Sequence, residues 1–285
     1  MGAFKNLAAI GLALLVVTGS ALADRTEEVS EVVPIEGADR LQVEIDFGAG
    51  TLDIMSADIE EAAKLDILYS PRWVSYDIDY SKRGNTGRLF LESELRRKSH
   101  MEDIDNEWEL TLSRRYPLDL EMDVGASESI IDLGGIPLTR LVMDIGATSG
   151  AIDFSRPNPE RLRDFDIDVG ASSLEITGLA NANFERMDIS SGAASCELDF
   201  RGDFHGESEV DLEVGVGSVD IIVPRGLALR IEGDESWFSS LDIHGIDLDQ
   251  IDDDVWETPG FDGARDRLTI MVDVSMGSVD IYEKR

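Results

Sequence analysis

The sequence predicts an all-β protein built as a right-handed β-solenoid-like stack of short strands. Three observations predict this fold class. A phrase of alternating apolar and acidic residues recurs seven times, glycine interrupts most copies near their middle, and amphipathic helix patterns are almost absent. Only residues 58–64 and 157–163 have the composition for one or two helical turns, and neither segment is long enough for a core helix.

Each copy of the phrase predicts two strands joined at a bend. Apolar residues alternate with acidic ones before the bend, which is the pattern of a strand with one buried face. Glycine then permits a sharp corner. The four central intervals are 21, 24, 20 and 25 residues, the length of one coil in a stack of repeats. The copies are VEIDFGAGTLDI from Val43, LEMDVGASESIIDLGG from Leu120, LVMDIGATSGAIDF from Leu141, FDIDVGASSLEI from Phe165, RMDISSGAASCELDF from Arg186, DLEVGVGSVDI from Asp211 and MVDVSMGSVDI from Met271.

Stacking of such copies places acidic residues above one another on the outside, at the strand spacing of about 4.8 Å. The second acidic residue follows the first by 7 or 9 residues, and both offsets keep it on the same side of the chain. We predict an acidic ladder formed by Asp46, Asp123, Asp144, Asp168, Asp188, Glu213 and Asp273. The second positions are Asp53, Asp132, Asp153, Glu175, Glu197, Asp220 and Asp280.

The segments outside the copies are expected to differ from them. Residues 55–119 have the alternation of longer, meandering strands, and the polar section 93–106 is expected to be an exposed loop. At the N-terminus, Lys5 precedes an apolar run over 7–17 and the small-x-small sequence Ala21-Leu22-Ala23. This pattern predicts a signal peptide cleaved after Ala23, because eleven apolar residues are too few to span a bilayer. We therefore expect a periplasmic or extracellular protein.

Charge excludes some classes of partner. The chain has 25 Lys and Arg against 59 Asp and Glu, a formal net charge of −34, so it has no basic face for nucleic acid or an anionic membrane. Low Lys usage in so acidic a chain leaves adaptation to a saline habitat open as one origin of the charge. The single cysteine, Cys196, excludes an internal disulfide and is interpreted as a small packing residue.

No arrangement of catalytic residues emerges. His100, His205 and His244 are isolated in the sequence, and no nucleophile or phosphate-binding motif is present. The carboxylates repeat in equivalent exposed positions, whereas general acid and base catalysis needs two different environments. The sequence therefore predicts a protein that is not an enzyme, with a polysaccharide-active enzyme as the less favoured alternative and no cofactor.

Two other kinds of site remain candidates. Calcium takes six to eight oxygen ligands, so it could bind the ladders or the denser cluster Asp247, Asp249, Asp252, Asp253 and Asp254, although neither matches a known calcium loop. Trp237 and Phe238 form an aromatic pair among polar residues and are a candidate contact site. The basic clusters 96–98 and 114–115 form either a patch for a partner or pairs with nearby acidic residues, and the second interpretation is favoured.

The chain resembles a known group of bacterial envelope proteins. The acidic-x-Gly-Ala copies, WELTLSRRYPLDL at 108–120 and GLANANF at 178–184 are similar to the toast-rack domain. WETPGFDGARDRLTI from Trp256 and GSVDI at 217–221 and 277–281 resemble the LiaF-like cell-wall-active antibiotic response and putative-adhesin family.

The sequence predicts a signal peptide over 1–23 and an acidic lead-in over 24–38, and the resemblance implies a toast-rack domain over 39–205 and LiaF-like coils over 206–285 that continue the stack. It implies no catalytic residues. We expect a non-catalytic envelope protein that presents an extended acidic surface, as an adhesin-like or stress-response scaffold. The expected partner is an envelope protein or glycan. The alternative is a structural protein stiffened by calcium. Open strand edges at the ends of the coil leave either a monomer or an end-to-end oligomer.

Overall fold

The computed structural model describes residues 26–96, 105–233 and 241–284. The fold is all-β, as predicted: within these residues the regular elements are strands of one sheet and two short 3-10 helices. The elements are β1 (Glu27–Val33), β2 (Arg40–Ala57), β3 (Ala63–Tyr69), β4 (Val74–Arg83), β5 (Thr86–Leu95), β6 (Asn106–Ser113), β7 (Leu118–Asp132), β8 (Leu138–Ile145), β9 (Ser149–Asp153), β10 (Asp164–Val169), β11 (Ser173–Thr177), η1 (Leu179–Ala182), β12 (Arg186–Asp199), β13 (Glu207–Pro224), β14 (Ala228–Gly233), β15 (Leu241–His244), β16 (Asp249–Asp252), β17 (Val255–Glu257), η3 (Phe261–Gly263) and β18 (Arg267–Lys284).

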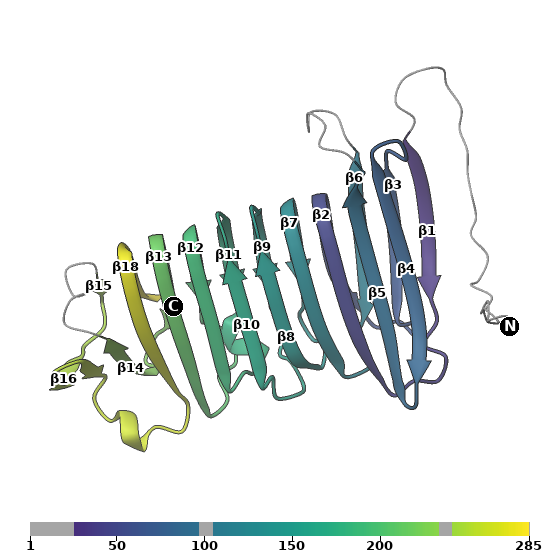
Figure 1. Ribbon diagram of the computed structural model, residues 1–285. Coiled ribbons are helices and arrows are strands. Elements are labelled where there is room, and N and C mark those ends of the chain that lie inside the picture. Colours follow the sequence, from purple (N-terminus) through teal and green to yellow (C-terminus); the bar gives the residue numbers. More distant parts are fainter. Residues whose placement is uncertain (1–25, 97–104, 234–240, 285) are drawn as a thin grey trace, which may run out of the picture.

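The sheet is folded along the bends of its repeats into two walls of an elongated stack (Figure 1). The first wall contains the strand residues before each bend, and the second wall contains those after it. The long strands β2, β7, β12, β13 and β18 belong to both walls, whereas β8 with β9 and β10 with β11 divide the same path between two strands. Parallel pairing in register joins each repeat to the next in both walls.

Two neighbours in the stack are far apart in the chain. Asp46 of β2 lies beside Asp123 of β7, although 77 residues separate them. Glu213 of β13 likewise pairs with Asp273 of β18, which is 60 residues later. The stack is therefore built from the repeats alone, and the intervening segments pack at its two ends.

The core lies between the walls. The alternating residues of each strand that point inward, such as Leu120, Met122 and Val124 of β7, are at most 1% exposed. They belong to one continuous apolar cluster that runs through the stack and includes Trp108 at its N-terminal end. Burial of these side chains is the main stabilising contribution, because the described chain contains no disulfide.

The return loops that follow the second wall stack in register as well. The rings of Phe154, Phe184 and Phe200 from these segments and of Phe165 from β10 form a row, with successive centroids 5.7, 5.9 and 6.3 Å apart in chain order. Asn158 donates to the backbone oxygens of Leu138 and Ala182 in neighbouring turns. These contacts hold 157–163 in an extended loop, so the helical turn expected there is absent, and 58–64 forms none either.

Further strands continue the sheet beyond both ends of the repeats. At the N-terminal end, β5 and β6 pair in parallel with the two halves of β2, and antiparallel β4, β3 and β1 follow them. The predicted lead-in 24–38 contains β1. At the C-terminal end, β14 and β15 pair with β18, and β17 and β16 extend the first wall. Among the described residues, the outermost strands β1, β4 and β16 each pair on one side only, so end-to-end association through open strand edges stays a prediction.

The loop predicted over 93–106 is shorter than expected. Ser93 lies within β5 and Asn106 is the first residue of β6, and both side chains are buried. The Asn106 amide donates to Ser93 Oγ at 2.8 Å and to the Ala49 carbonyl at 2.6 Å. Residues 97–104 lie outside the described residues.

We predict that the bend tolerates no side chain at Gly217. Its φ of 142° favours glycine, and an added Cβ would lie 1.9 Å from the Ala194 carbonyl oxygen of the neighbouring strand. Gly217→Ala should therefore destabilise the protein by about 3 kcal/mol, from backbone strain plus separation of the strands. Gly226→Ala is the matched control, because its φ is also positive but nothing lies within 4 Å. It should cost about 1 kcal/mol. Urea unfolding followed by Trp fluorescence measures both, and equal losses would contradict the close approach.

Candidate functional site

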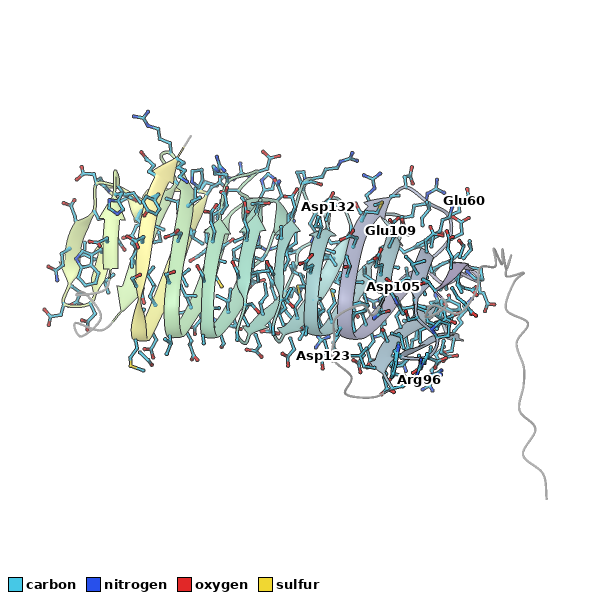
Figure 2. The ribbon with its side chains drawn as sticks, turned by 90° about the horizontal axis from the view of Figure 1, so that it is seen from above. Glu60, Arg96, Asp105, Glu109, Asp123 and Asp132 are labelled. Atoms are coloured by element: carbon cyan, nitrogen blue, oxygen red, sulfur yellow. The ribbon has the colours of Figure 1, made fainter. Side chains whose placement is uncertain are left out.

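The outer face of the first wall has a row of carboxylates. Parallel register places Asp46 beside Asp123, Asp123 beside Asp144 and Asp144 beside Asp168. Glu213 and Asp273 continue the row beyond one interruption, and Glu92 of β5 precedes Asp46. We call this set the first-wall row: Glu92, Asp46, Asp123, Asp144, Asp168, Glu213 and Asp273. Figure 2 shows Asp123 at one margin of the stack and Asp132, from the same strand, at the other.

One residue of the predicted ladder lies in a different row. Asp188 pairs with Asp166 and Asp211, and Ser190 occupies its expected place beside Asp168 and Glu213. The reason is its distance from the bend: Asp188 precedes Gly192 by four residues, whereas Asp168 precedes Gly170 by two. A shift of two residues preserves the face, so Asp188 still points outward. In this copy, counting back from Gly192 gives the correct register. It does not find Glu92, which lies outside the seven copies.

The register of Asp188 creates a close pair of carboxylates. Asp166 is partly buried, and burial is the main cause that raises its pKa. The charge of Asp188 and a side-chain hydrogen bond with it raise the pKa further. The folded state therefore binds a proton at Asp166 more readily than the unfolded chain does.

The outer face of the second wall carries two adjacent rows. Parallel register aligns the hydroxyls of Ser149, Ser173, Ser195, Ser218 and Ser278, with Thr51 and Glu128 before them. Two residues further along each strand, it aligns Asp53, Ile130, Ala151, Glu175, Glu197, Asp220 and Asp280. Asp132 and Asp153 pair with each other one outward position later, so two of the predicted second acidic residues are outside this row.

An open groove of about 760 Å³ follows these two rows across the second wall. Five carboxylates line it, and so do the exposed side chain of Ile130 and the small residues Gly150 and Ala151. We call it the second-wall groove, with the carboxylates Asp53, Glu128, Glu175, Glu197 and Asp220. Cys196 lies beneath its surface at 4% exposure, and burial raises the pKa of its thiol, which supports a packing role.

The aspartates proposed as a metal site do not form one in the part of the chain that the structure describes. Asp247, Asp249, Asp252, Asp253 and Asp254 lie around β16 and β17, and no three His, Cys, Asp or Glu side chains come together there or in the other described stretches in a group that could hold a metal ion. His205 and His244 are far apart in the chain, and His244 stacks on Tyr282 with centroids 4.8 Å apart. His100, Trp237 and Phe238 lie outside the described residues.

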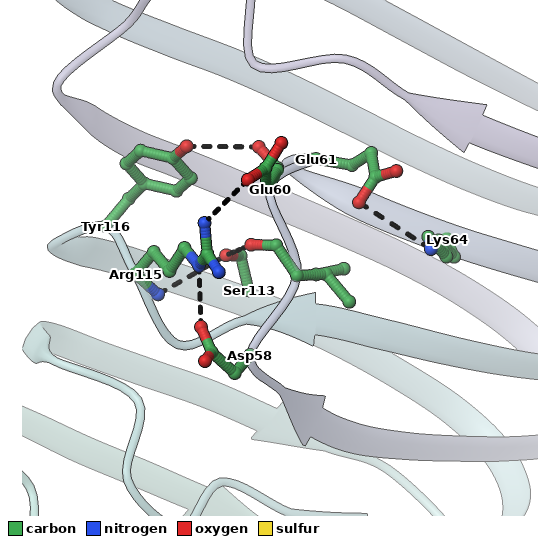
Figure 3. Close-up of polar contacts among 8 residues, drawn as sticks. Asp58, Glu60, Glu61, Lys64, Ser113, Arg115 and Tyr116 are labelled. Carbon is green, nitrogen blue, oxygen red and sulfur yellow. Dashed lines mark hydrogen bonds and ion pairs between the residues drawn. The ribbon is translucent and has the colours of Figure 1, made fainter.

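The basic cluster at 114–115 is used within the fold. Arg115 donates to Asp58 at 2.6 Å and to Glu60 at 3.2 Å (Figure 3). The hydrogen bond from Arg115 holds the pKa of Asp58 below its usual value.

A separate groove on the first wall is lined by three arginines, Arg83, Arg88 and Arg140, and by four carboxylates. Sequence analysis missed this arrangement because the three arginines come from three different strands.

We predict that Asp166→Asn stabilises the protein at neutral pH. A raised folded-state pKa means that the ionised carboxylate opposes folding, fully above the folded pKa and not at all below the unfolded value of 3.8. Two like charges at strand spacing repel by about 0.9 kcal/mol in water, so the gain at pH 7 should be up to about 1 kcal/mol. The difference in unfolding free energy from wild type should disappear as the pH falls below 4. Asp144→Asn is the exposed control, and a gain for Asp166→Asn that is independent of pH would contradict the assignment.

Comparison with known proteins gives a family for the chain. The model of the N-terminal domain of toast-rack proteins, DUF2154, matches residues 22–177 and 158–222. No curated protein matches. The helices within the described stretches are too short and too polar to cross a bilayer.

Solved structures with a similar arrangement have low sequence identity to this chain. A "putative cell adhesion protein" from Clostridium sporogenes is 16% identical with a TM-score of 0.45, over 91% of this chain and 100% of that one. A "putative adhesin" from Bacteroides fragilis is 9% identical with a TM-score of 0.36, over 91% and 98%. Because the family model covers well over half of the sequence, this chain belongs to the family of proteins with the toast-rack N-terminal domain.

Proposed function

We propose that this chain is a non-catalytic protein of the cell envelope whose stack presents an extended acidic surface to a binding partner. The first-wall row carries the proposal. Seven carboxylates from seven strands lie at register positions along the stack, and six of them, all but Glu92, are largely exposed to solvent. Neighbouring charges in such a row repel by about 0.9 kcal/mol in water and more near a protein surface. A cationic partner would relieve this repulsion along the whole row.

The parallel pairing of successive repeats supports the finer architecture that we propose, a right-handed solenoid. Parallel strands joined by a crossover are right-handed in nearly all proteins. The uninterrupted register of β12, β13 and β18 supports residues 206–285 as a continuation of the toast-rack stack. The location outside the cytoplasm rests on the sequence of residues 1–23.

An enzyme and a calcium-stiffened protein remain the two alternatives. Purified protein incubated with anionic and neutral polysaccharides should give no product, and product formation would favour the enzyme. Calorimetry should give weak heats of similar size for Ca²⁺ and Mg²⁺. A strong Ca²⁺-selective heat would favour the structural role of calcium.

Export is testable with the full chain fused to alkaline phosphatase, which is active only outside the cytoplasm. We expect active fusion protein in the periplasm or medium, with a mature N-terminus at Asp24 by mass spectrometry. Leu14→Arg interrupts the apolar run and should retain the fusion, inactive, in the cytoplasm. Equal activity of the two fusions would contradict the signal peptide.

Binding through the acidic surface is testable with three substitutions in the first-wall row. Asp123→Asn/Asp144→Asn/Asp168→Asn should lower saturable binding to isolated envelopes of the source organism at least tenfold, because adjacent charges act together. Asp247→Asn/Asp249→Asn/Asp252→Asn removes the same number of exposed charges elsewhere and should change binding no more than twofold. Melting temperatures confirm that both variants fold. Equal losses, or no saturable binding by wild type, would contradict the proposal.

A further inference from the structure

The second-wall groove repeats one chemical unit along the stack. Each of β11 and β12 contributes a serine and, two residues later, a glutamate: Ser173 with Glu175, and Ser195 with Glu197. Asp220 of β13 continues the carboxylate row. Successive units are about 4.8 Å apart, the strand spacing of a sheet. The groove therefore offers hydroxyl oxygens along one side and carboxylates along the other.

Four of the five groove carboxylates lie outside the ion pairs of the fold. Among the described residues, no ion pair within 4.0 Å joins a Lys, Arg or His nitrogen to Asp53, Glu128, Glu175 or Asp220. Glu197 lies near Arg201, whose pKa is raised mainly by Asp199 and further by the charge of Glu197. Other acidic residues of the chain are paired in this way, as Asp58 is with Arg115 at 2.6 Å. A positively charged ligand therefore complements the second-wall groove.

The shape of the groove selects a long, thin ligand. Its lining crosses six strands, β2, β7, β9, β11, β12 and β13, a length of about 24 Å at strand spacing. The floor is low at Gly150 and Ala151, between Ile130 and Glu175 in the neighbouring strands. Gly150 is required there, because a Cβ would lie 2.3 Å from the Ser129 carbonyl oxygen. Among the residues that the structure describes, no aromatic ring lines the groove, which argues against a quaternary ammonium ligand held in an aromatic cage.

The spacing of the carboxylates discriminates between cationic chains. In an extended aliphatic polyamine, amines separated by three or four methylenes are about 5 to 6 Å apart, because each staggered single bond advances the chain by about 1.25 Å. Side chains on one face of an extended peptide are about 6.7 Å apart. The three-methylene spacing of a polyamine, about 5 Å, is the one that matches carboxylates about 4.8 Å apart.

We propose that the second-wall groove binds a linear aliphatic polyamine along the stack axis. Ammonium groups donate to Glu175, Glu197 and Asp220, and their remaining hydrogens are donated to the hydroxyls of Ser173 and Ser195. The methylene segments lie over Ala151 and Ile130. This inference rests on the proposed acidic-surface function, and it names a ligand for the second wall of the stack.

Isothermal titration calorimetry of the full chain with spermine at low ionic strength tests the groove. Glu175→Gln/Glu197→Gln should weaken spermine binding at least tenfold. Asp144→Asn/Asp168→Asn is the matched control, since it neutralises two carboxylates in register on adjacent strands of the first wall, and it should change affinity no more than twofold. Ala151→Phe fills the floor without changing the charge and should also weaken binding tenfold.

Three outcomes would overturn the polyamine site. These are equal losses in the glutamate and control variants, unchanged binding in Ala151→Phe, and oligolysine of equal charge binding more tightly than spermine in the same groove. None of them affects envelope binding through the first-wall row, so the failure of the groove is distinguishable from the failure of the proposed function. Putrescine, with two amines, should bind at least tenfold more weakly than spermine.

Discussion

The rest of the structure depends on the close approach of neighbouring backbones at the bend. An added Cβ at Gly125 would lie 2.3 Å from the carbonyl oxygen of Gly48, and the next copies repeat the contact, with each bend glycine set against the one before it. Backbone hydrogen bonds such as those from Ala147 to Gly125 and from Ala171 to Gly146 link the same residues. Because the bend admits a single alignment, it fixes the register of both walls, and with it the position of every outward side chain.

The N-terminal end shows what happens when the bend is missing. There β5 and β6 pair with the two halves of β2 as a coil would, but a longer excursion replaces the glycine corner between them. The Asn106 side chain donates to the Ala49 carbonyl at 2.6 Å. Its own oxygen accepts from Trp108 Nε1 at 3.0 Å. A buried amide thus closes the stack where the repeat pattern ends, and the antiparallel strands can attach beyond it.

Sequence reasoning was strongest where the pattern is local. Alternation and the bend glycines gave the strands, their inward faces and most of the first-wall row, because each depends on neighbours within one copy. It failed where pairing joins distant segments. The contacts of Asp46 with Asp123 and of Glu213 with Asp273 span insertions whose path is set by tertiary packing, and Glu92 joins the row through such a pairing. The hydroxyl row was present in the repeats, two residues before the second acidic residue in five of the seven copies, but serine alone gives no signal of a ligand.

The acidity follows from the same register. A strand with one buried face must place polar residues outward, and parallel pairing in register puts equivalent residues side by side, so one acidic preference per copy becomes a continuous row of like charges. Asp166 and Asp188 show the cost, since burial and proximity together raise the pKa of Asp166. In the second wall, Ile130 of β7 and Ala151 of β9 interrupt the row of carboxylates between Asp53 and Glu175, which reduces the repulsion and lowers the floor of the groove. The register therefore determines both the repulsion between the remaining carboxylates and the shape of the groove. A ligand that neutralises these carboxylates must also fit the groove.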